Sequence, residues 1–522
     1  MVLLSVVGAL SLSPTAVALP PPTGAPSVDH WQQELLRVDD LRHNRRPLAA
    51  SAVAADLLDA HPPREVARQA RYAMGMALSD LDLNWSARRL WLEVVADDAT
   101  DPVGRAATRA LLAPHTDDLS AQLIVLSALL PEGVTAEALP PGPSDAARYT
   151  RALGRLDAGE LAEARRQLGM VTGVLEGRAR ALEAGIAVQQ GDLGGAARAL
   201  GQAHRLAGER GDQALQDHTA LTAGRLQYGL EFYEAAADSY GRVEPGRPLW
   251  PDAREEQAWA YFQNGQSDLA LGNAVSLASP WGRMVPTPEV DLIKGIARLE
   301  TCRFDEARQT AEDLRDELAT TVAAMDGWLS IATPETAWDD SFGALDGGVG
   351  SRRAGAVPAG VWRVALRDRT LAARAAEVAS LEAELDRIAQ QKPVWVDAVG
   401  TALMNDLHRD LARAREAAGA RVVASLQRQR AHLVDVQAQA DVLAFEAVDG
   451  QRRMLQELAR SPEPAVTGAG APIDFAVDTQ LVYWPFNGEF WADELDSYRV
   501  VMPSVCHELA AGSQETRVVR RL

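Results

Sequence analysis

The sequence predicts an all-α protein built from repeated helical hairpins, and two observations lead to that fold class. Aromatic residues make up only 5% of the chain, whereas a pleated sheet selects β-branched and aromatic side chains. Alanine and leucine, which favour helices, dominate instead. From about residue 49 to residue 333, apolar residues recur with helical spacing between short polar or glycine-containing turns. With 522 residues the chain exceeds one ordinary core, so two or three domains are expected.

A short sequence phrase recurs through this helical region. It begins with glycine or a polar residue and ends five positions later with alanine, as from Gly159 to Ala164. Successive copies are separated by 32, 40, 34 and 37 residues, which indicates a repeated unit of two helices. The alanines that end the phrase are Ala164, Ala196, Ala236, Ala270 and Ala307, and a looser early copy ends at Ala87.

A second small residue stands twelve positions before each of these alanines. We expect each pair to lie where two antiparallel helices cross, because small side chains let two backbones approach closely. The earlier members of the pairs are Gly75, Ala152, Ala184, Gly224, Ala258 and Gly295.

The phrase and its spacing resemble the tetratricopeptide repeat (TPR), a helix-turn-helix unit of about 34 residues, over roughly residues 67–318. The first helix matches less well, since Arg148, Arg180 and Arg254 stand where a bulky apolar residue is usual. The resemblance implies a TPR-like α-solenoid over residues 49–333 whose first helices line a concave protein-binding groove. The exact repeat boundaries stay open. The candidate groove residues, for which plain core packing is the alternative, are Tyr149, Arg225, Tyr228, Trp259, Phe262 and Gln263.

The N-terminus has the pattern of an export signal. Residues 1–18 contain a short apolar run and end in a small-x-small cleavage pattern, although no lysine or arginine precedes the run. A proline-rich segment follows at residues 19–48. We therefore expect an exported, periplasmic protein, with a disordered apolar N-terminus as the alternative. In an oxidising compartment Cys302 and Cys506 can form a bridge, but the sequence leaves their pairing open.

A second helical region is expected at residues 361–460, after a glycine-rich linker at residues 334–360. Pro393 is expected to end one helix and begin the next, and Gly419 to split the long pattern that follows. A short antiparallel bundle is therefore expected rather than one rod. A coiled-coil seam is indicated by the spacing of Val378, Leu381, Leu385 and Ile388.

Residues 461–522 are interpreted as an aromatic C-terminal module and tail. Its expected elements are a strand that ends at Trp484, a turn at residues 485–488 and a short helix at residues 489–498. The aromatic residues of this stretch either cap the helices or dock a partner, since aromatic side chains dominate interface hot spots. They are Tyr483, Trp484, Phe486, Phe490, Trp491 and Tyr498.

The stretch from Tyr483 to Leu495 is similar to the ending of repeat proteins of the myxobacterial cell envelope that are associated with adventurous gliding motility. The resemblance implies a periplasmic scaffold in an envelope or motility complex. It assigns no catalytic residue.

Composition and motifs narrow the function further. The sequence contains no phosphate-binding glycine loop, paired-histidine zinc helix or nucleophile elbow, so we expect no enzyme activity, cofactor or metal. The net charge of −20 argues against a nucleic-acid partner, and no later stretch is apolar enough to span a membrane. The sequence thus predicts a non-catalytic scaffold that binds other proteins of a cell-envelope complex. The alternative is a structural protein whose coiled coil joins copies into a homo-oligomer.

Overall fold

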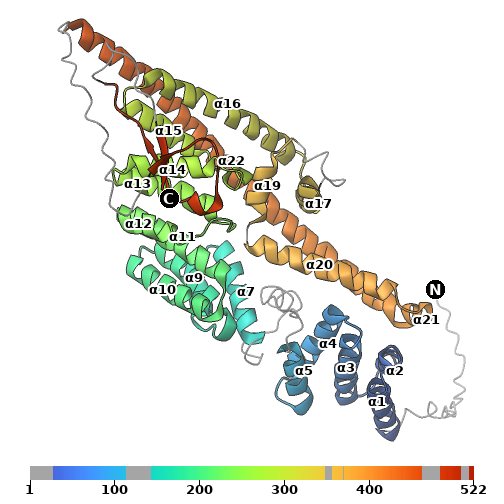
Figure 1. Ribbon diagram of the computed structural model, residues 1–522. Coiled ribbons are helices and arrows are strands. Elements are labelled where there is room, and N and C mark those ends of the chain that lie inside the picture. The colour runs from blue at the N-terminus through green and yellow to red at the C-terminus, as the bar shows by residue number, and fades with distance from the viewer. Residues whose placement is uncertain are drawn as a thin grey trace, which may run out of the picture.

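The computed structural model describes residues 28–112, 143–346, 356–367, 369–460, 483–506 and 517–521. The signal peptide expected at residues 1–18 lies outside the described residues. Helices make up most of the described chain (Figure 1), so the all-α prediction is confirmed.

The helices of the first two thirds of the chain pack as consecutive hairpins (Figure 1). Six hairpins contain the recurring sequence phrase, and α5 (Pro102–Leu112) packs on the first of them. The hairpins are α3 (Arg64–Ser79) with α4 (Asn84–Asp97), α7 (Pro143–Asp157) with α8 (Leu161–Gly169), α9 (Glu176–Gln189) with α10 (Leu193–Arg210), α11 (Gln213–Gly229) with α12 (Tyr233–Tyr240), α13 (Trp250–Gln263) with α14 (Ser267–Leu277), and α15 (Glu289–Glu300) with α16 (Phe304–Leu329).

Helices begin inside the proline-rich segment expected at residues 19–48. Helix α1 covers Val28–His43, and Pro47 is the first residue of α2 (Pro47–Asp59). Proline fits there because the first N–H groups of a helix have no partner within the helix. Burial of Trp31 and Val38 anchors α1 to its neighbours.

Gly75 and Gly224 lie where the two helices of their hairpin cross, as expected, whereas Gly295 of the last hairpin faces Leu443 of α22 instead. The six alanines that end the phrase, from Ala87 to Ala307, have no exposed surface. A Cβ atom on Gly75 would collide with the ring of Trp91, and one on Gly224 would lie 2.5 Å from Tyr240 Cε1. Close approach of the two helices therefore depends on the small residues.

The turn of each hairpin contains one residue with positive φ, always five positions before the alanine. Glycine, which adopts this conformation without steric cost, occupies it in three hairpins. The residues are Gly159, Gly191 and Gly265, with φ of 76°, 74° and 74°, and Asp82, Glu231 and Cys302, with φ of 60°, 64° and 62°.

The second helical region differs from the expected short bundle. After α20 (Arg369–Ala389) and α21 (Pro393–Trp395), a π-helical turn leads into α22 (Thr401–Arg460), a single helix of 60 residues. Gly419 does not split this helix. A Cβ atom there would collide with the carbonyl oxygen of Pro334, so the glycine allows a neighbouring helix to approach instead.

The expected seam and helix boundary in this region are confirmed. Val378, Leu381 and Ile388 are buried, and Leu385 packs on the same core. They join α20 to α22, which runs back along it after the break that Pro393 ends.

The prediction of a linker at residues 334–360 is wrong for the first half of that range. Residues Pro334–Asp346 form α17, and α19 (Ala359–Leu366) follows. Trp338 is buried, and Asp340 is 1% exposed and accepts a hydrogen bond of 3.1 Å from Trp328 Nε1. The glycines that suggested a linker stand at the end of α17 and after it, whereas its first turns present an apolar face to α22.

Helices α20 and α22 fold back against the hairpins (Figure 1). At one end, Glu384 of α20 accepts hydrogen bonds from the backbone N–H groups of Trp85 and Ser86, at 2.7 and 2.8 Å. At the other end, Leu443 of α22 packs against Gly295 of α15. Helices α20 and α22 together thus connect early and late hairpins.

A small three-stranded sheet replaces part of the expected C-terminal pattern. Strands β1 (Tyr483–Pro485) and β2 (Tyr498–Val501) both pair antiparallel with β3 (Arg517–Arg521), in the order β1-β3-β2. The helix expected at residues 489–498 is wrong: only a 3-10 turn, Ala492–Glu494, forms there. Alternate burial along β2, at Tyr498 and Val500, suits a strand with one covered face.

Candidate partner-binding surfaces

The C-terminal segment packs across α14, the second helix of its hairpin. The backbone of β2 approaches so closely that a Cβ atom on Gly272 would collide with the carbonyl oxygen of Tyr498. The Ser276 hydroxyl donates to the carbonyl oxygen of Leu495. Arg499 forms an ion pair of 3.0 Å with Asp268. These contacts make the segment part of the folded body.

Three of the six C-terminal aromatic residues form one cluster. The ring centroids of Phe486 and Phe490 lie 5.2 and 6.2 Å from that of Tyr498, and 5.1 Å from each other. Tyr498 is buried, and both phenylalanines pack on the core of α11 to α15. Trp491 is different, since 55% of its surface is exposed. The side chains of Tyr483 and Trp484 lie outside the described part of the chain.

The aromatic residues therefore divide between the two expected roles. Phe486, Phe490 and Tyr498 cover the helices, as a cap would. Trp491 is exposed and stays a candidate for docking.

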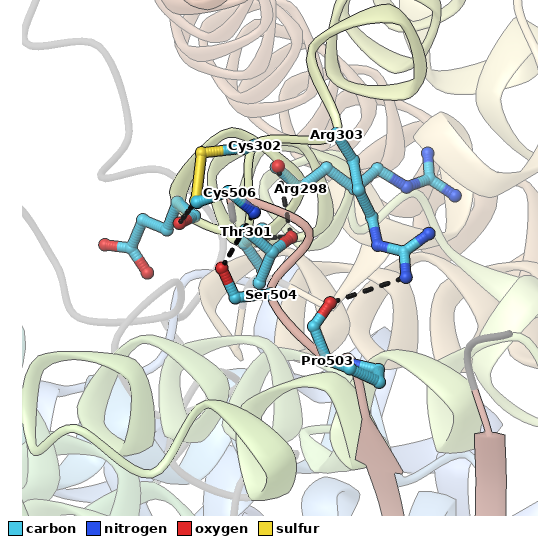
Figure 2. The surroundings of a disulfide bond; sticks show 9 residues. Arg298, Thr301, Cys302, Arg303, Pro503, Ser504 and Cys506 are labelled. Atoms are coloured by element: carbon cyan, nitrogen blue, oxygen red, sulfur yellow. Dashed lines mark hydrogen bonds between the residues drawn. A yellow bond between two sulfur atoms is a disulfide. The ribbon is translucent and has the colours of Figure 1, made fainter. Parts of the chain in front are cut away.

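A disulfide attaches the end of this segment to the turn between α15 and α16 (Figure 2). Cys302 and Cys506 are bonded, with their Cα atoms 5.0 Å apart. Beside the bridge, the backbone N–H of Val505 donates to the carbonyl oxygen of Thr301 at 3.0 Å. Arg303 donates to the carbonyl oxygen of Pro503 at 3.4 Å. The two cysteines, whose pairing the sequence left open, are thus bonded because the turn between α15 and α16 lies beside the end of the C-terminal segment.

The same C-terminal segment explains why Arg254 can stand at a position of the repeat where a bulky apolar residue is usual. Only 3% of its surface is exposed, and its Nε atom lies 3.1 Å from Asp496 Oδ1. Its Nη2 atom donates to the carbonyl oxygen of Val243 at 3.3 Å. Burial lowers the pKa of this guanidinium, and the charge of Asp496 opposes that effect. An arginine fits this core position because a distant carboxylate reaches it.

Five of the six candidate groove residues come together on α11 and α13. Arg225 of α11 donates to both carboxylate oxygens of Glu256 on α13, at 3.0 and 2.8 Å. Tyr228 is half-buried and hydrogen-bonds Gln263, which is exposed. These residues connect the first helices of two successive hairpins.

Trp259 and Phe262 extend this face toward α15. The indole Nε1 of Trp259 donates to Glu289 at 2.6 Å, and its ring meets that of Phe262 edge-on at 6.3 Å. Both rings are partly buried against neighbouring cores. Tyr149 does not join this group: it lies on α7, two hairpins earlier, and packs on the larger core.

Four carboxylates on the same face were not among the predicted residues, and we call them the acidic surface. The sequence signal was available, since three of them stand at positions 252, 255 and 256 of one predicted helix, on a single face. The acidic surface consists of Asp252, Glu255, Glu256 and Glu289.

Glu255 is the most enclosed member of the acidic surface. Its carboxylate accepts a hydrogen bond of 2.9 Å from the backbone N–H of Glu289, the first residue of α15. Burial, followed by the charge of Glu289, holds the pKa of Glu255 well above its usual range. Burial also raises the pKa of Asp252.

An arginine and a histidine from the second helical region reach this face. Arg367, directly after α19, donates to Asp252 at 2.6 Å. His432 of α22 lies with Nε2 3.5 Å from Glu289 Oε1. Two guanidinium groups, those of Arg225 and Arg367, thus face the four carboxyl groups of the acidic surface.

The hairpins, the returning long helix and the packed tail define a class: an all-α protein with a helical repeat-like architecture. Comparison of the chain with protein-family models and with curated proteins gives no match to either. Among the helices that the structure describes, none is long and apolar enough to cross a membrane. Within those same residues, no group of three or more histidine, cysteine or acidic side chains is placed to hold a metal ion.

Proposed function

We propose that this chain is a non-catalytic interaction scaffold of the cell envelope, whose TPR-type hairpins bind a positively charged segment of a partner protein. The observation that supports this most directly is the acidic surface, where carboxylates of α13 and α15 lie beside Trp259 and Tyr228.

The chemistry of this face favours a basic partner. A guanidinium or ammonium group would reduce the repulsion between Glu255 and Glu289, which contributes to the raised pKa of Glu255. Aromatic faces such as that of Trp259 also attract cations, by roughly 0.5–2 kcal/mol. An arginine-rich segment combines both interactions, because its guanidinium binds carboxylates and stacks on rings.

The proposed location depends on different observations. The bond between Cys302 and Cys506 suits an oxidising compartment, and the N-terminal sequence has the pattern of an export signal. An association with gliding motility is supported only by the similarity of the stretch from Tyr483 to Leu495.

The experiment is capture from native cell-envelope extracts, with the full disulfide-bonded chain as bait. Replacing Glu256 and Glu289 together by Gln removes two charges from the acidic surface while keeping hydrogen-bond acceptors for Arg225 and Trp259. We expect partner affinity to fall about tenfold or more, and the dependence on salt to weaken.

The matched control replaces Asp313 and Asp316 on α16 by Asn, which removes the same charge from another surface. Retention of the same partners by the Glu256 and Glu289 variant, at unchanged affinity, would contradict the proposed surface. Binding lost equally in both variants would indicate a general charge effect, which also contradicts it.

The tail is tested by Trp491→Ala, which removes an exposed ring. A chain cut after Arg460 is not a clean test, because it removes the rings packed on α14 and the partner of Cys302. If the Trp491→Ala variant no longer captures a partner, the tail contains a docking site. If it captures the same partners, the tail acts only as a cap.

The second candidate function is self-assembly. The observation that favours it is a row of exposed apolar residues on α22, far from the acidic surface in sequence.

A further inference from the structure

The last third of α22 has two apolar faces. One faces the hairpins: Leu443 and Ala447 are buried, and a Cβ atom on Gly450 would lie 2.5 Å from Phe304 Cε1 of α16. The other face is turned away from them. Its exposed apolar side chains, with 61, 66, 52 and 58% of their surface accessible, are Val442, Phe445, Val448 and Leu455.

The second face continues beyond the body of the protein. The first residues of α16 lie beside Gly450 and Gln451, where Gln451 reaches Asp305 at 3.5 Å. Helix α22 then runs on to Arg460, past the end of α16 (Figure 1). Among the residues that the structure describes, none covers the exposed side chains of α22 at this end.

The exposed positions follow the alternating three- and four-residue spacing of a coiled-coil seam. Six exposed residues occupy these positions. In order they are the small Ala438, the acidic Asp441, the aromatic Phe445, the aliphatic Val448, the basic Arg452 and the aliphatic Leu455.

This order is self-complementary when two copies run antiparallel. A two-fold axis between residues 446 and 447 places Phe445 of each copy opposite Val448 of the other. The same axis places Asp441 opposite Arg452, twice, and Ala438 opposite Leu455. A parallel arrangement would instead place Asp441 opposite Asp441 and Arg452 opposite Arg452, which is unfavourable.

We propose that this face of α22, which we name the α22 seam, pairs with the same face of a second copy of the chain in an antiparallel two-helix contact. The contact depends on the residues of the seam and not on the acidic surface, so either proposal can fail without the other.

The local charges and the shape of the body both accommodate this contact. Arg452 contacts Asp449, which Arg453 also contacts, so Asp449 keeps a partner when Arg452 turns to the second copy. Helices α15 and α16 lie against α22 on the N-terminal side of Arg452 and on its opposite face. The antiparallel axis therefore carries the two bodies toward opposite ends of the pair.

The test measures molecular mass by sedimentation equilibrium from about 1 to about 100 µM, since a short two-helix contact gives a modest affinity. We expect the full disulfide-bonded chain to dimerise in this range. Asp441→Arg and Arg452→Asp each create two like-charged pairs across the axis, so each should weaken the dimer about tenfold or more.

The decisive variant carries both changes. Asp441→Arg combined with Arg452→Asp restores opposite charges across an antiparallel axis and should recover the dimer. Glu446→Arg changes the charge of the same helix outside the seam and should leave the dimer intact. Helicity from circular dichroism checks that every variant is folded.

A chain that stays monomeric at the highest concentration overturns the proposal. So does a dimer that the single changes leave unaltered, and so does a double variant that stays monomeric beside a dimeric parent. Capture of a different protein by the seam, with the purified chain monomeric, also overturns it.

Discussion

Gly75 and Gly224 show how single residues set the spacing between paired helices. Sixteen positions after each glycine, the second helix presents a large ring, Trp91 or Tyr240, which packs against the glycine backbone. Two other hairpins use a different combination at the same positions. There alanine faces leucine, as Ala152 with Leu168 and Ala184 with Leu200, all of them buried.

The size of one residue is thus compensated by the size of the other. Gly224→Ala should destabilise the protein by about 1–3 kcal/mol, because the added methyl group overpacks Tyr240. Adding Tyr240→Leu should make the combination that other hairpins contain, and recover part of the loss. Urea unfolding of both single variants and the double variant measures the coupling.

The control for this cycle is Gly201→Ala, also within a helix, where an added Cβ atom meets nothing within 4 Å. It should raise stability by up to about 1 kcal/mol through helix propensity. Strictly additive effects at positions 224 and 240 would contradict the compensation.

Glu255 makes stability depend on pH. Its pKa is raised in the fold by burial and by Glu289, so the native state binds its proton more tightly than the unfolded chain does. The resulting destabilisation is full above the native pKa, shrinks as pH falls below it, and disappears only below the lower pKa of the unfolded chain. Glu255→Gln should therefore raise the melting temperature at pH 7 to 8 by about 1–2 °C, with the difference shrinking on acidification.

Calorimetry at several pH values checks this expectation. Glu209→Gln, at a half-exposed position of α10, should show no comparable trend. If the difference in melting temperature between Glu255→Gln and the parent grew on acidification, it would contradict this prediction.

At the scale of elements, the turn of the last hairpin has a second role. Cys302 has φ of 62° at the position where Gly159, Gly191 and Gly265 stand in other turns. A glycine there would relieve backbone strain but could not form the bridge to Cys506. The cysteine is retained at a conformational cost and attaches the C-terminal segment to the hairpin.

Two pairs of substitutions separate the bridge from the turn. Both lose a link between residues 204 positions apart, which in the chain-entropy model removes roughly 5 kcal/mol of stabilisation. Cys302→Gly with Cys506→Ser should be more stable than Cys302→Ser with Cys506→Ser by about 0.5–1 kcal/mol, since only glycine suits the turn.

Hydrogen exchange should locate the effect. Amides of β2 and α14 should exchange faster in both pairs of variants, whereas those of α9 and α10 should not change. Unaltered protection of β2 would show that its packing on Gly272, rather than the disulfide, holds the segment.

At the scale of the whole molecule, α20 and α22 hold distant hairpins together. Glu384 of α20 is 1% exposed and accepts the first backbone N–H groups of α4, from Trp85 and Ser86. It also accepts from the Ser86 hydroxyl at 2.6 Å. A carboxylate almost three hundred residues away thus caps this helix, which suits the positive end of the helix dipole.

Glu384→Ala should cost about 3 kcal/mol, because it leaves three buried donors without their acceptor. Glu382→Ala, on the same helix but paired at the surface with Arg415, should cost less than about 1 kcal/mol. Chemical unfolding gives both values, and exchange of α4 amides shows whether the contact between the two regions opens. Equal effects of the two variants would argue against this contact.

Much of the fold followed from local pattern, and the errors share one cause. The residues around Gly419 and the glycines near residue 350 suggested breaks, because glycine weakens an isolated helix. In the protein, α17 packs against Gly419 through Pro334, and tertiary packing outweighs the local preference. The helix expected at residues 489–498 failed for the same reason, since β2 pairs with β3 from the end of the chain.

The sequence predicted the candidate groove residues but not the residues that they contact, and the reason is physical. Repeat spacing places Arg225 and Trp259 on equivalent first helices, so their common face could be inferred. Their partners could not be inferred so directly, because Glu289 belongs to the next hairpin and Arg367 to the second helical region. Whether this face binds a protein stays a prediction.

By itself, the sequence determined the helical class, the hairpin unit and the crossing points, because short-range spacing dictates which faces are apolar and which turns accept positive φ. Only the tertiary structure decided that α22 is one helix, that α20 caps α4, and that Cys302 meets Cys506. Those features join residues hundreds of positions apart. Their stability comes from burial, close packing and covalent linkage between surfaces, which no local window of the chain contains.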